Sequence, residues 1–317
     1  MPIQAHSTLI LEPDNYSSDA LAIYGRLGNV WLGHAPEKAA VSLLVVRLGR
    51  VIDAALLDEF PSLCAIASPT TGLNHIDLVE CERRDIRVFS LADCRDAISK
   101  VTSTSELALG LMIALLRNIP LAAEDVSRRG NWNRDVFRSR QLSRLTLGII
   151  GIGRLGGHMC GYARALEMKV LAYDPYQNEE RFDELGASRM DLIPLLQAAD
   201  IVTVHASLRD DNRNLLSTRE IGAMRPHALL VNTARGGLVD EHAVASALQE
   251  RRLGGYAADV LADEHKEPRW LENSPVFQAA ARGLNVLLTP HIGGCTTDAM
   301  HLTEERLAGV VYDCMEG

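Results

Sequence analysis

The sequence predicts an α/β fold built from two parallel sheets, and three observations support this class. Short β-like runs alternate with helical segments through most of the chain, which is typical of a parallel sheet covered by helices. The 317 residues exceed the roughly 250–300 residues at which a single core stops growing, so we expect two domains. A second, more regular series of strands begins near residue 146 and predicts a doubly wound sheet.

The first hundred residues predict a small α/β unit. Its β-like runs are 7–11, 41–46, 63–67 and 87–89. The pattern Ser103-x-x-Glu106 then predicts a capping box that opens an unusually apolar helix over 106–117. Because this helix is apolar on nearly all sides, we expect it to be buried between two bodies.

The second half of the chain predicts six strands with helices between them. The strands are 147–150, 170–173, 201–204, 228–231, 256–258 and 286–288. The segment 119–145 is the least regular stretch, and we interpret it as a connection between strand and helix layers rather than a flexible linker.

A dinucleotide-binding fingerprint follows the first strand of this series. Gly151-x-Gly153-x-x-Gly156 stands directly after a predicted strand and opens a predicted helix. In this context the first glycine allows a tight turn, the second lets a pyrophosphate approach the backbone, and the third lets helix and strand pack closely. The phosphates would lie at the positive end of the helix.

Asp174 identifies the expected cofactor. It ends the next predicted strand, close to the ~20-residue distance expected of an acid that binds the adenosine ribose hydroxyls. A carboxylate repels a 2′-phosphate, and the following Pro175-Tyr176 offers no basic residue to receive one. The sequence therefore favours NAD over NADP. The alternative for Asp174 is a solvated carboxylate at a strand end.

Polar residues follow the last three predicted strands. Arg235, then Asp259 and Glu264, then His291 come after successive strands, and ligands of open α/β sheets lie outside these carboxyl ends. Arginine is the usual partner of a carboxylate. Histidine can accept a proton near neutral pH, and a neighbouring carboxylate fixes its tautomer. These residue types suit the conversion of a 2-hydroxy acid into a 2-keto acid, although a single histidine at a strand end often has only a structural role.

Four motifs in order carry a family resemblance. TLGIIGIGRLGG, VNTARGGLVDE, AADVLADE and LLTPHIGG resemble the successive signatures of the NAD-dependent D-isomer-specific 2-hydroxyacid dehydrogenase family, over roughly residues 41–310. The resemblance implies a Rossmann-type NAD-binding domain over 103–293. It also implies a smaller, flavodoxin-like substrate domain formed by both chain ends, 1–102 and 294–317.

The resemblance implies roles for individual residues. Arg235 would bind and polarise the substrate, His291 would be the acid/base, and Glu264 its carboxylate partner. The implied cofactor-binding residues are Gly151, Gly153, Arg154, Leu155, Gly156, Asp174, His205, Thr233, Ala234, Asp259 and Gly294.

The first domain also contains implied substrate contacts. TTGLNHID resembles the family loop that holds the substrate carboxylate with backbone N–H groups, which points to Thr71, Gly72 and Leu73. The alternative is an ordinary glycine-containing turn. Arg47 matches a position at which phosphoglycerate-type members bring an arginine to the substrate, and Arg50 is near but out of register. A solvent-facing arginine is the alternative for both.

Two departures from the family pattern affect these expectations. The family usually has a Glu-Pro pair at the catalytic carboxylate, whereas here Glu267 precedes the proline and Glu264 has the expected five-residue spacing from Asp259. We favour Glu264 and keep Glu267 as the alternative. The family's proline two residues after His205 is replaced, which predicts a looser loop.

The bulk properties exclude several classes. A formal net charge of −9 argues against non-specific binding of nucleic acid or of an anionic membrane surface. The N-terminus has no signal-peptide pattern and the chain has no 18-residue apolar run, so a cytoplasmic protein is expected. The six cysteines form no C-x-x-C pair, so no metal site is predicted.

We therefore predict an NAD-dependent oxidoreductase that transfers a hydride between nicotinamide and C2 of a D-2-hydroxy acid or 2-keto acid, with 3-phosphoglycerate or a glycerate-like acid as candidates. The alternatives are an NAD(H)-sensing, corepressor-like binding protein of the same fold and a dehydrogenase of a non-hydroxy-acid reductant. A homodimer through the cofactor domain is implied by resemblance. The sequence leaves open the particular acid, the physiological direction, and whether a short tail follows Gly317.

Overall fold

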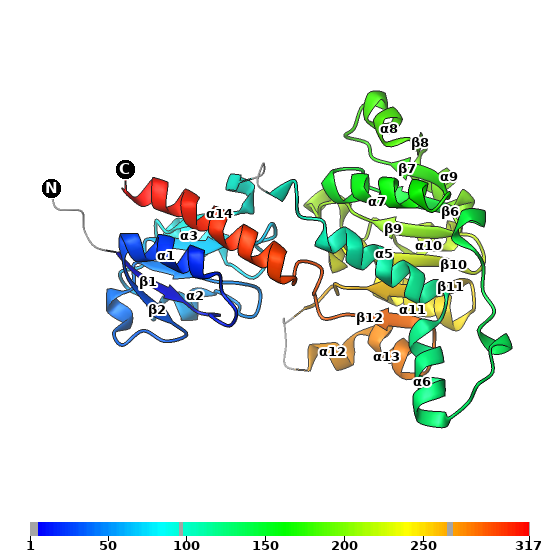
Figure 1. Cartoon of the computed structure of the whole chain (residues 1–317), viewed down its shortest axis with the longest axis horizontal. Coiled ribbons are helices and arrows are strands. Elements are labelled where there is room, and N and C mark those ends of the chain that lie inside the picture. The colour runs from blue at the N-terminus through cyan, green and yellow to red at the C-terminus, as the bar shows by residue number, and fades with distance from the viewer. Residues whose placement is uncertain (1–5, 95–97, 265–268, 317) are drawn as a thin grey trace. The chain divides into compact units, whose positions relative to one another are not determined.

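The computed structural model describes residues 6–94, 98–264 and 269–316. These residues divide into two compact units, 1–101 with 295–317 (unit 1) and 102–294 (unit 2). Each unit contains one parallel sheet (Figure 1). The α/β class with two parallel sheets is therefore confirmed.

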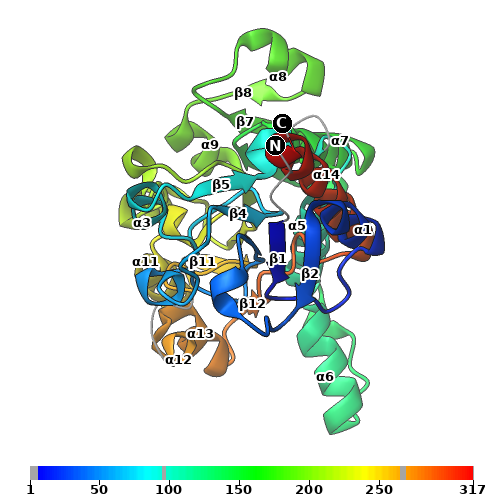
Figure 2. The ribbon, with the colours of Figure 1, turned by 90° about the vertical axis from the view of Figure 1, so that its left-hand side faces the viewer.

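Unit 1 has a five-stranded sheet in the order β2-β1-β3-β4-β5. Its elements are β1 (His6–Ile10), α1 (Ser18–Leu27), β2 (Gly28–Leu32), β3 (Leu43–Val45), α2 (Ala54–Leu57), β4 (Ala65–Ser68), α3 (Leu78–Arg83), β5 (Arg87–Ser90) and α14 (Thr297–Glu316). The C-terminal helix α14 packs beside α1 (Figure 1, Figure 2). Both ends of the chain thus contribute to this unit.

The edge strand β2 was not predicted. Gly28 begins it with φ +146°, and a Cβ there would lie 2.1 Å from the carbonyl oxygen of His6 on the neighbouring strand. Only glycine allows this approach. Glycine and asparagine are depleted in strands, so the run GNVWL gives a weak strand pattern.

Unit 2 has a seven-stranded sheet in the order β12-β11-β10-β9-β6-β7-β8. Its strands are β6 (Thr146–Ile150), β7 (Lys169–Tyr173), β8 (Ser188–Arg189), β9 (Ile201–Val204), β10 (Ala228–Asn232), β11 (Leu253–Ala258) and β12 (Val286–Leu288). Its helices are α5 (Ser103–Leu116), α6 (Ile119–Arg129), α7 (Arg154–Ala165), α8 (Glu179–Leu185), α9 (Leu192–Ala198), α10 (Thr218–Ala223), α11 (Glu241–Gln249), α12 (Trp270–Asn273) and α13 (Pro275–Ala281). The six predicted strands are all present, and the two-residue β8 was missed.

Helix α5 corrects one expectation. The capping box at Ser103 is wrong, because the helix already begins there and the hydroxyl of Thr102 donates to the Glu106 carboxylate instead. Glu106 and Gly110 on one face of the helix are exposed. The opposite face packs on α7 and on strands β10 to β12.

The segment 119–145 is more regular than predicted at its start. Residues 119–129 form α6. Pro120 lies in the first turn of this helix, where a backbone N–H has no partner within the helix, so proline loses no hydrogen bond there. Among the described residues no single helix is long and apolar enough to cross a membrane, although the bent pair α5 and α6 passes that test together by length and composition.

The core of unit 1 depends on the C-terminal helix. Leu307 in α14 is fully buried in a cluster with Tyr24, Phe89 and strand residues of the sheet. We expect Leu307→Ala to destabilise the protein by about 2–5 kcal/mol, because a buried leucine leaves a cavity. Urea unfolding followed by the fluorescence of Trp31 in β2 measures this, and Arg306→Ala, an exposed change one residue away, is the control. Equal unfolding midpoints for the two variants would contradict the assigned packing.

Candidate active site

The loop between β6 and α7 requires glycine at two positions. Gly151 has φ +87°, and a Cβ there would lie 2.8 Å from the backbone nitrogen of Ala206. A Cβ on Gly156 would lie 1.9 Å from the carbonyl oxygen of Gly151. The first and third glycines of the fingerprint therefore make the tight turn and the close helix–strand contact.

Gly153, the middle glycine, is different because space is open around it. It is the N-cap of the 12-residue helix α7, and no atom lies within 4 Å of the position of its Cβ. Phosphate groups can therefore approach the backbone N–H groups at the positive end of α7. Arg154 begins this helix, and burial lowers the pKa of its guanidinium. Leu155 follows, and its carbonyl oxygen accepts a 3.3 Å hydrogen bond from Ser105 Oγ of α5.

Asp174 is placed beside this loop after β7. Its carboxylate accepts hydrogen bonds from the backbone N–H groups of Ile152 at 2.9 Å and of Tyr176 at 3.0 Å. Sequence reasoning missed Arg209, whose guanidinium lies 4.2 Å from the centre of the Tyr176 ring. Pro175 and Tyr176 themselves offer no basic residue, and the loop after β9 supplies one from a distant part of the sequence.

His205 follows β9 and is desolvated. Its backbone N–H donates to the carbonyl of Ile150 at 2.7 Å, and its Nε2 lies 2.9 Å from Thr203 Oγ1. Nδ1 is buried and has no hydrogen-bond partner in the described part of the chain. Burial lowers the pKa of His205 to about 4, so the ring is neutral at physiological pH.

Asn232, the last residue of β10, holds the turn that contains Arg235 through two hydrogen bonds. Its side-chain oxygen accepts from the N–H of Ala234 at 3.0 Å, and its amide donates to the carbonyl of Arg235 at 2.9 Å. Thr233 and Ala234 within the turn are buried. Sequence reasoning did not single out Asn232, although a polar residue at the end of a buried strand was a signal for it.

Arg235 is held near the next loop. Burial lowers the pKa of its guanidinium, while the charge of Glu264 opposes that shift. A Cβ on the following Gly236 would lie 2.0 Å from the carbonyl carbon of Leu261, so the loops after β10 and β11 touch through their backbones. The glycine therefore brings the arginine and the carboxylate to the same strand ends.

His291 and Glu264 form a direct pair. His291 Nδ1 lies 2.7 Å from Glu264 Oε2, and both side chains are partly exposed, at 29% and 22%. The other oxygen of Glu264 accepts from the backbone N–H of Leu261 at 2.6 Å. Because Nδ1 is engaged, Nε2 of His291 is the ring atom that can exchange a proton with a ligand. Glu267, the alternative partner, lies outside the described residues.

Asp259 holds the loop that carries His291. This carboxylate is 2% exposed and accepts hydrogen bonds from Thr289 Oγ1 at 2.6 Å, Ile292 N at 2.8 Å and Gly293 N at 2.7 Å. Burial raises the pKa of Asp259, and these hydrogen bonds oppose the shift. Its contacts in the structure are thus with the histidine loop, whereas Gly294, the other predicted cofactor residue of this segment, is exposed with open space around it.

Unit 1 contains the remaining predicted residues. Thr71, Gly72 and Leu73 form a turn after β4, in which Thr70 Oγ1 donates to the carbonyl of Gly72 at 2.8 Å. Within the described residues their three backbone N–H groups donate no hydrogen bond. Arg47 follows β3 and pairs with Glu304 of α14.

The described part of unit 2 contains a cavity away from these residues. A cavity of about 610 Å³ in unit 2 is lined by Arg140, Asp200 and Arg225 among other residues, and it lies at the opposite edge of the sheet, where β9, β10 and β11 begin. No group of three or more His, Cys, Asp or Glu side chains that could hold a metal ion occurs in the described ranges.

Comparison with known proteins agrees with this geometry. Residues 109–293 match the family model described as "D-isomer specific 2-hydroxyacid dehydrogenase, NAD binding domain". A D-3-phosphoglycerate dehydrogenase of Methanocaldococcus jannaschii is 32% identical over 97% of this chain and 57% of its own length. One from Synechocystis sp. is 31% identical over 89% of this chain and 48% of its own length. The chain thus spans about half the length of these curated relatives.

A solved structure extends the likeness to the whole fold. The crystal structure of D-lactate dehydrogenase from Aquifex aeolicus, complexed with NAD and lactic acid, matches with a TM-score of 0.81 at 25% identity, covering 98% of this chain and 96% of that chain.

A glycine-rich loop of the nucleotide-binding type and a histidine–carboxylate pair lie at the carboxyl ends of one parallel sheet, where sheets of this kind bind ligands. The chain belongs to the D-isomer specific 2-hydroxyacid dehydrogenase family. The predicted family and the predicted cofactor, NAD, are confirmed.

The desolvated His205 predicts a pH dependence of stability. Its folded pKa of about 4 lies below the ~6.5 of an unfolded histidine, so between these values the unfolded chain binds more protons. The free energy of unfolding should therefore fall as the pH is lowered from about 6.5 to about 4, by up to about 3 kcal/mol from this residue. Urea unfolding of the protein and of His205→Gln across this range measures the effect. A variant that loses stability as steeply as the unaltered protein would refute the assignment.

Proposed function

We propose that this protein is an NAD-dependent dehydrogenase that interconverts a D-2-hydroxy acid and its 2-keto acid. The hydrogen bond between His291 Nδ1 and Glu264 Oε2 carries the proposal, since it leaves Nε2 to take or give the hydroxyl proton. NAD, held by the loop at Gly151, Gly153 and Gly156 with Asp174, supplies the hydride acceptor or donor when bound.

The remaining residues bind and orient the substrate. Arg235 would hold the substrate carboxylate and polarise the reacting oxygen, since a guanidinium pairs with a carboxylate through two parallel hydrogen bonds. The free N–H groups of Thr71, Gly72 and Leu73 offer further donors for an anion. Residues of both units would therefore contact the substrate, whereas the proposed NAD-binding loop belongs to unit 2.

The paired carboxylate is central to the proton transfer. When Nε2 takes the hydroxyl proton, the imidazole becomes a cation, and the carboxylate of Glu264 stabilises that charge at 2.7 Å. Asp259 accepts from the Thr289 hydroxyl before the histidine and from the backbone N–H of Ile292 after it, so the ring is oriented before the substrate arrives.

The D-3-phosphoglycerate dehydrogenases among the relatives support a three-carbon substrate, 3-phosphoglycerate or a glycerate-like acid. A homodimer and a cytoplasmic location remain predictions from the resemblance and the sequence.

A panel of keto acids tests the function. We expect NADH to be oxidised with at least one of phosphohydroxypyruvate, hydroxypyruvate, glyoxylate, pyruvate and 2-ketoisocaproate. The decrease in NADH absorbance measures the reaction. If NADH binds but none of these acids is reduced, the protein is better explained as an NAD(H)-sensing binding protein.

The acid/base assignment has its own test. His291→Ala should lower kcat by about 10²–10⁴-fold, the usual contribution of a general acid/base, while the Kd of NADH changes only a few-fold. His242→Ala, which removes an exposed histidine from α11, serves as the control and should leave both quantities unchanged. Undiminished turnover in His291→Ala would remove this residue from the mechanism.

A further inference from the structure

Arg47 lies where the fold of unit 1 favours ligand binding. The strand order β2-β1-β3-β4-β5 reverses direction between β1 and β3, and sheets of this order bind ligands outside the carboxyl ends of the strands at that point. Arg47 follows β3 at this end, opposite the segment of residues 12–14 that follows β1. Its charge therefore bears directly on which substrates the unit can accept.

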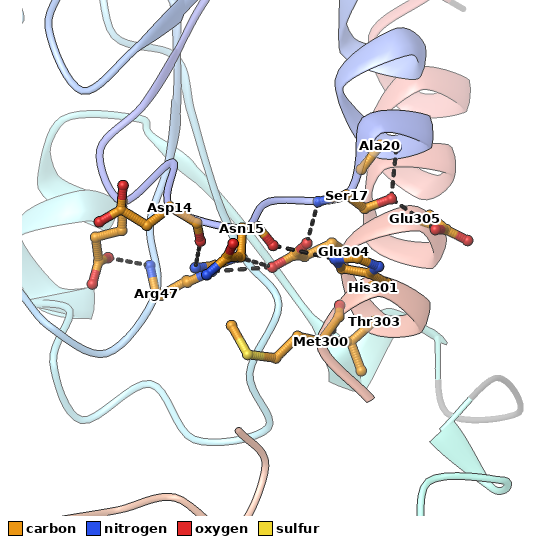
Figure 3. A network of polar contacts seen from close by, with 11 residues as sticks. Asp14, Asn15, Ser17, Ala20, Arg47, Met300, His301, Thr303, Glu304 and Glu305 are labelled. Atoms are coloured by element: carbon orange, nitrogen blue, oxygen red, sulfur yellow. Dashed lines mark hydrogen bonds and ion pairs between the residues drawn. The ribbon is translucent and has the colours of Figure 1, made fainter. Parts of the chain in front are cut away.

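Arg47 is occupied by partners within unit 1. Its Nε donates to Glu304 Oε1 at 3.0 Å, Nη2 contacts the same oxygen, and Nη1 donates to the carbonyl of Asp14 at 2.9 Å (Figure 3). The guanidinium also lies 5.0 Å from the centre of the Tyr16 ring. Three of its nitrogen atoms are thus directed toward α14 and the segment after β1.

Glu304 is a buried charge that the proposed mechanism does not use. It is 1% exposed, and its second oxygen accepts from the backbone N–H of Ser17, the N-cap of α1, at 2.8 Å. Both carboxylate oxygens are therefore engaged. A buried carboxylate with this partner cancels the positive charge of Arg47, and the pair as a whole is neutral.

Within the described residues, no lysine or arginine side chain is buried beside the pair. Glu12 accepts from the backbone N–H groups of Arg47 and of Gly49, which adds a negative charge beside the backbone of this segment. The loop that follows β4 contains no lysine or arginine from 68 to 77. Arg50 is exposed, and a fully hydrated cation attracts an anion only weakly.

We propose that Glu304 determines the substrate class by neutralising Arg47, so that the enzyme uses 2-keto and 2-hydroxy acids whose side chain carries no phosphate. This inference rests on the proposed function, and it selects the glycerate-like acid over 3-phosphoglycerate. A phosphate dianion needs at least one uncompensated cation, whereas a hydroxymethyl group needs only hydrogen bonds.

Two substrates that share a carbon skeleton test the inference in the unaltered protein. We expect kcat/KM for NADH-dependent reduction of hydroxypyruvate to exceed that of phosphohydroxypyruvate by at least about tenfold, a difference of about 1.4 kcal/mol. A preference for phosphohydroxypyruvate would overturn the inference while supporting the dehydrogenase function. Turnover of neither substrate, nor of the wider panel, would remove the proposed function and the inference with it.

A pair of isosteric variants assigns the effect to Glu304. Glu304→Gln leaves the Arg47 charge uncompensated, so the ratio of kcat/KM for phosphohydroxypyruvate to that for hydroxypyruvate should rise about tenfold. Glu305→Gln is the matched control, because Glu305 is the next residue and bonds the hydroxyl of Ser17 at 2.7 Å, with no contact to Arg47 in the described residues. Equal ratios in the two variants would overturn the role of Glu304. If Glu304→Gln does not fold, the comparison in the unaltered protein still decides the substrate class.

Discussion

The buried carboxylate of Asp259 is the constraint on which the site geometry depends. It collects three hydrogen bonds from the segment 289–293, and its own carbonyl accepts the N–H of His291 at 3.0 Å. His291 has φ +55°, a left-handed conformation that costs a non-glycine residue about 1 kcal/mol or more. A conformation of this kind persists only where surrounding contacts determine it, and the Asp259 hydrogen bonds are those contacts.

The sequence predicted six strands of unit 2 because each contains an apolar run. It missed two strands of the molecule whose stability comes from neighbouring strands. Strand β2 is an edge strand whose backbone approaches β1 at a glycine, and the polar pair Ser188-Arg189 forms β8 only by pairing with β7. The apparent capping box failed for a related reason. Ser103 and Glu106 had the right spacing, but the helix begins at Ser103 itself, and the side chain of Thr102 bonds the Glu106 carboxylate rather than the helix backbone.

The residue types at the strand ends predicted the position of the candidate site, because the carboxyl ends of parallel strands lie at one edge of the sheet regardless of the loops between them. The partners of those residues were harder to predict. Glu304 is separated from Arg47 by most of the chain, and Arg209 reaches Tyr176 from another loop, so neither pairing leaves a local pattern. The hydrogen-bond partners of Asp259 were also hard to predict from the sequence. Its identity was predicted, but its three partners depend on how the segment after β12 folds back.

The site therefore combines two kinds of residue with opposite requirements. Asn232 and Asp259 are buried, and their hydrogen bonds fix the turns after β10 and β12. Glu264 and His291 are partly exposed, because groups that exchange protons with a ligand must remain accessible to it. Burial strengthens the hydrogen bonds of Asn232 and Asp259. The free-energy cost of the strained backbone at His291 is therefore offset inside unit 2 before any ligand binds. The same arrangement recurs in unit 1, where buried Glu304 holds Arg47 at the end of β3, and there it fixes a charge as well as a position.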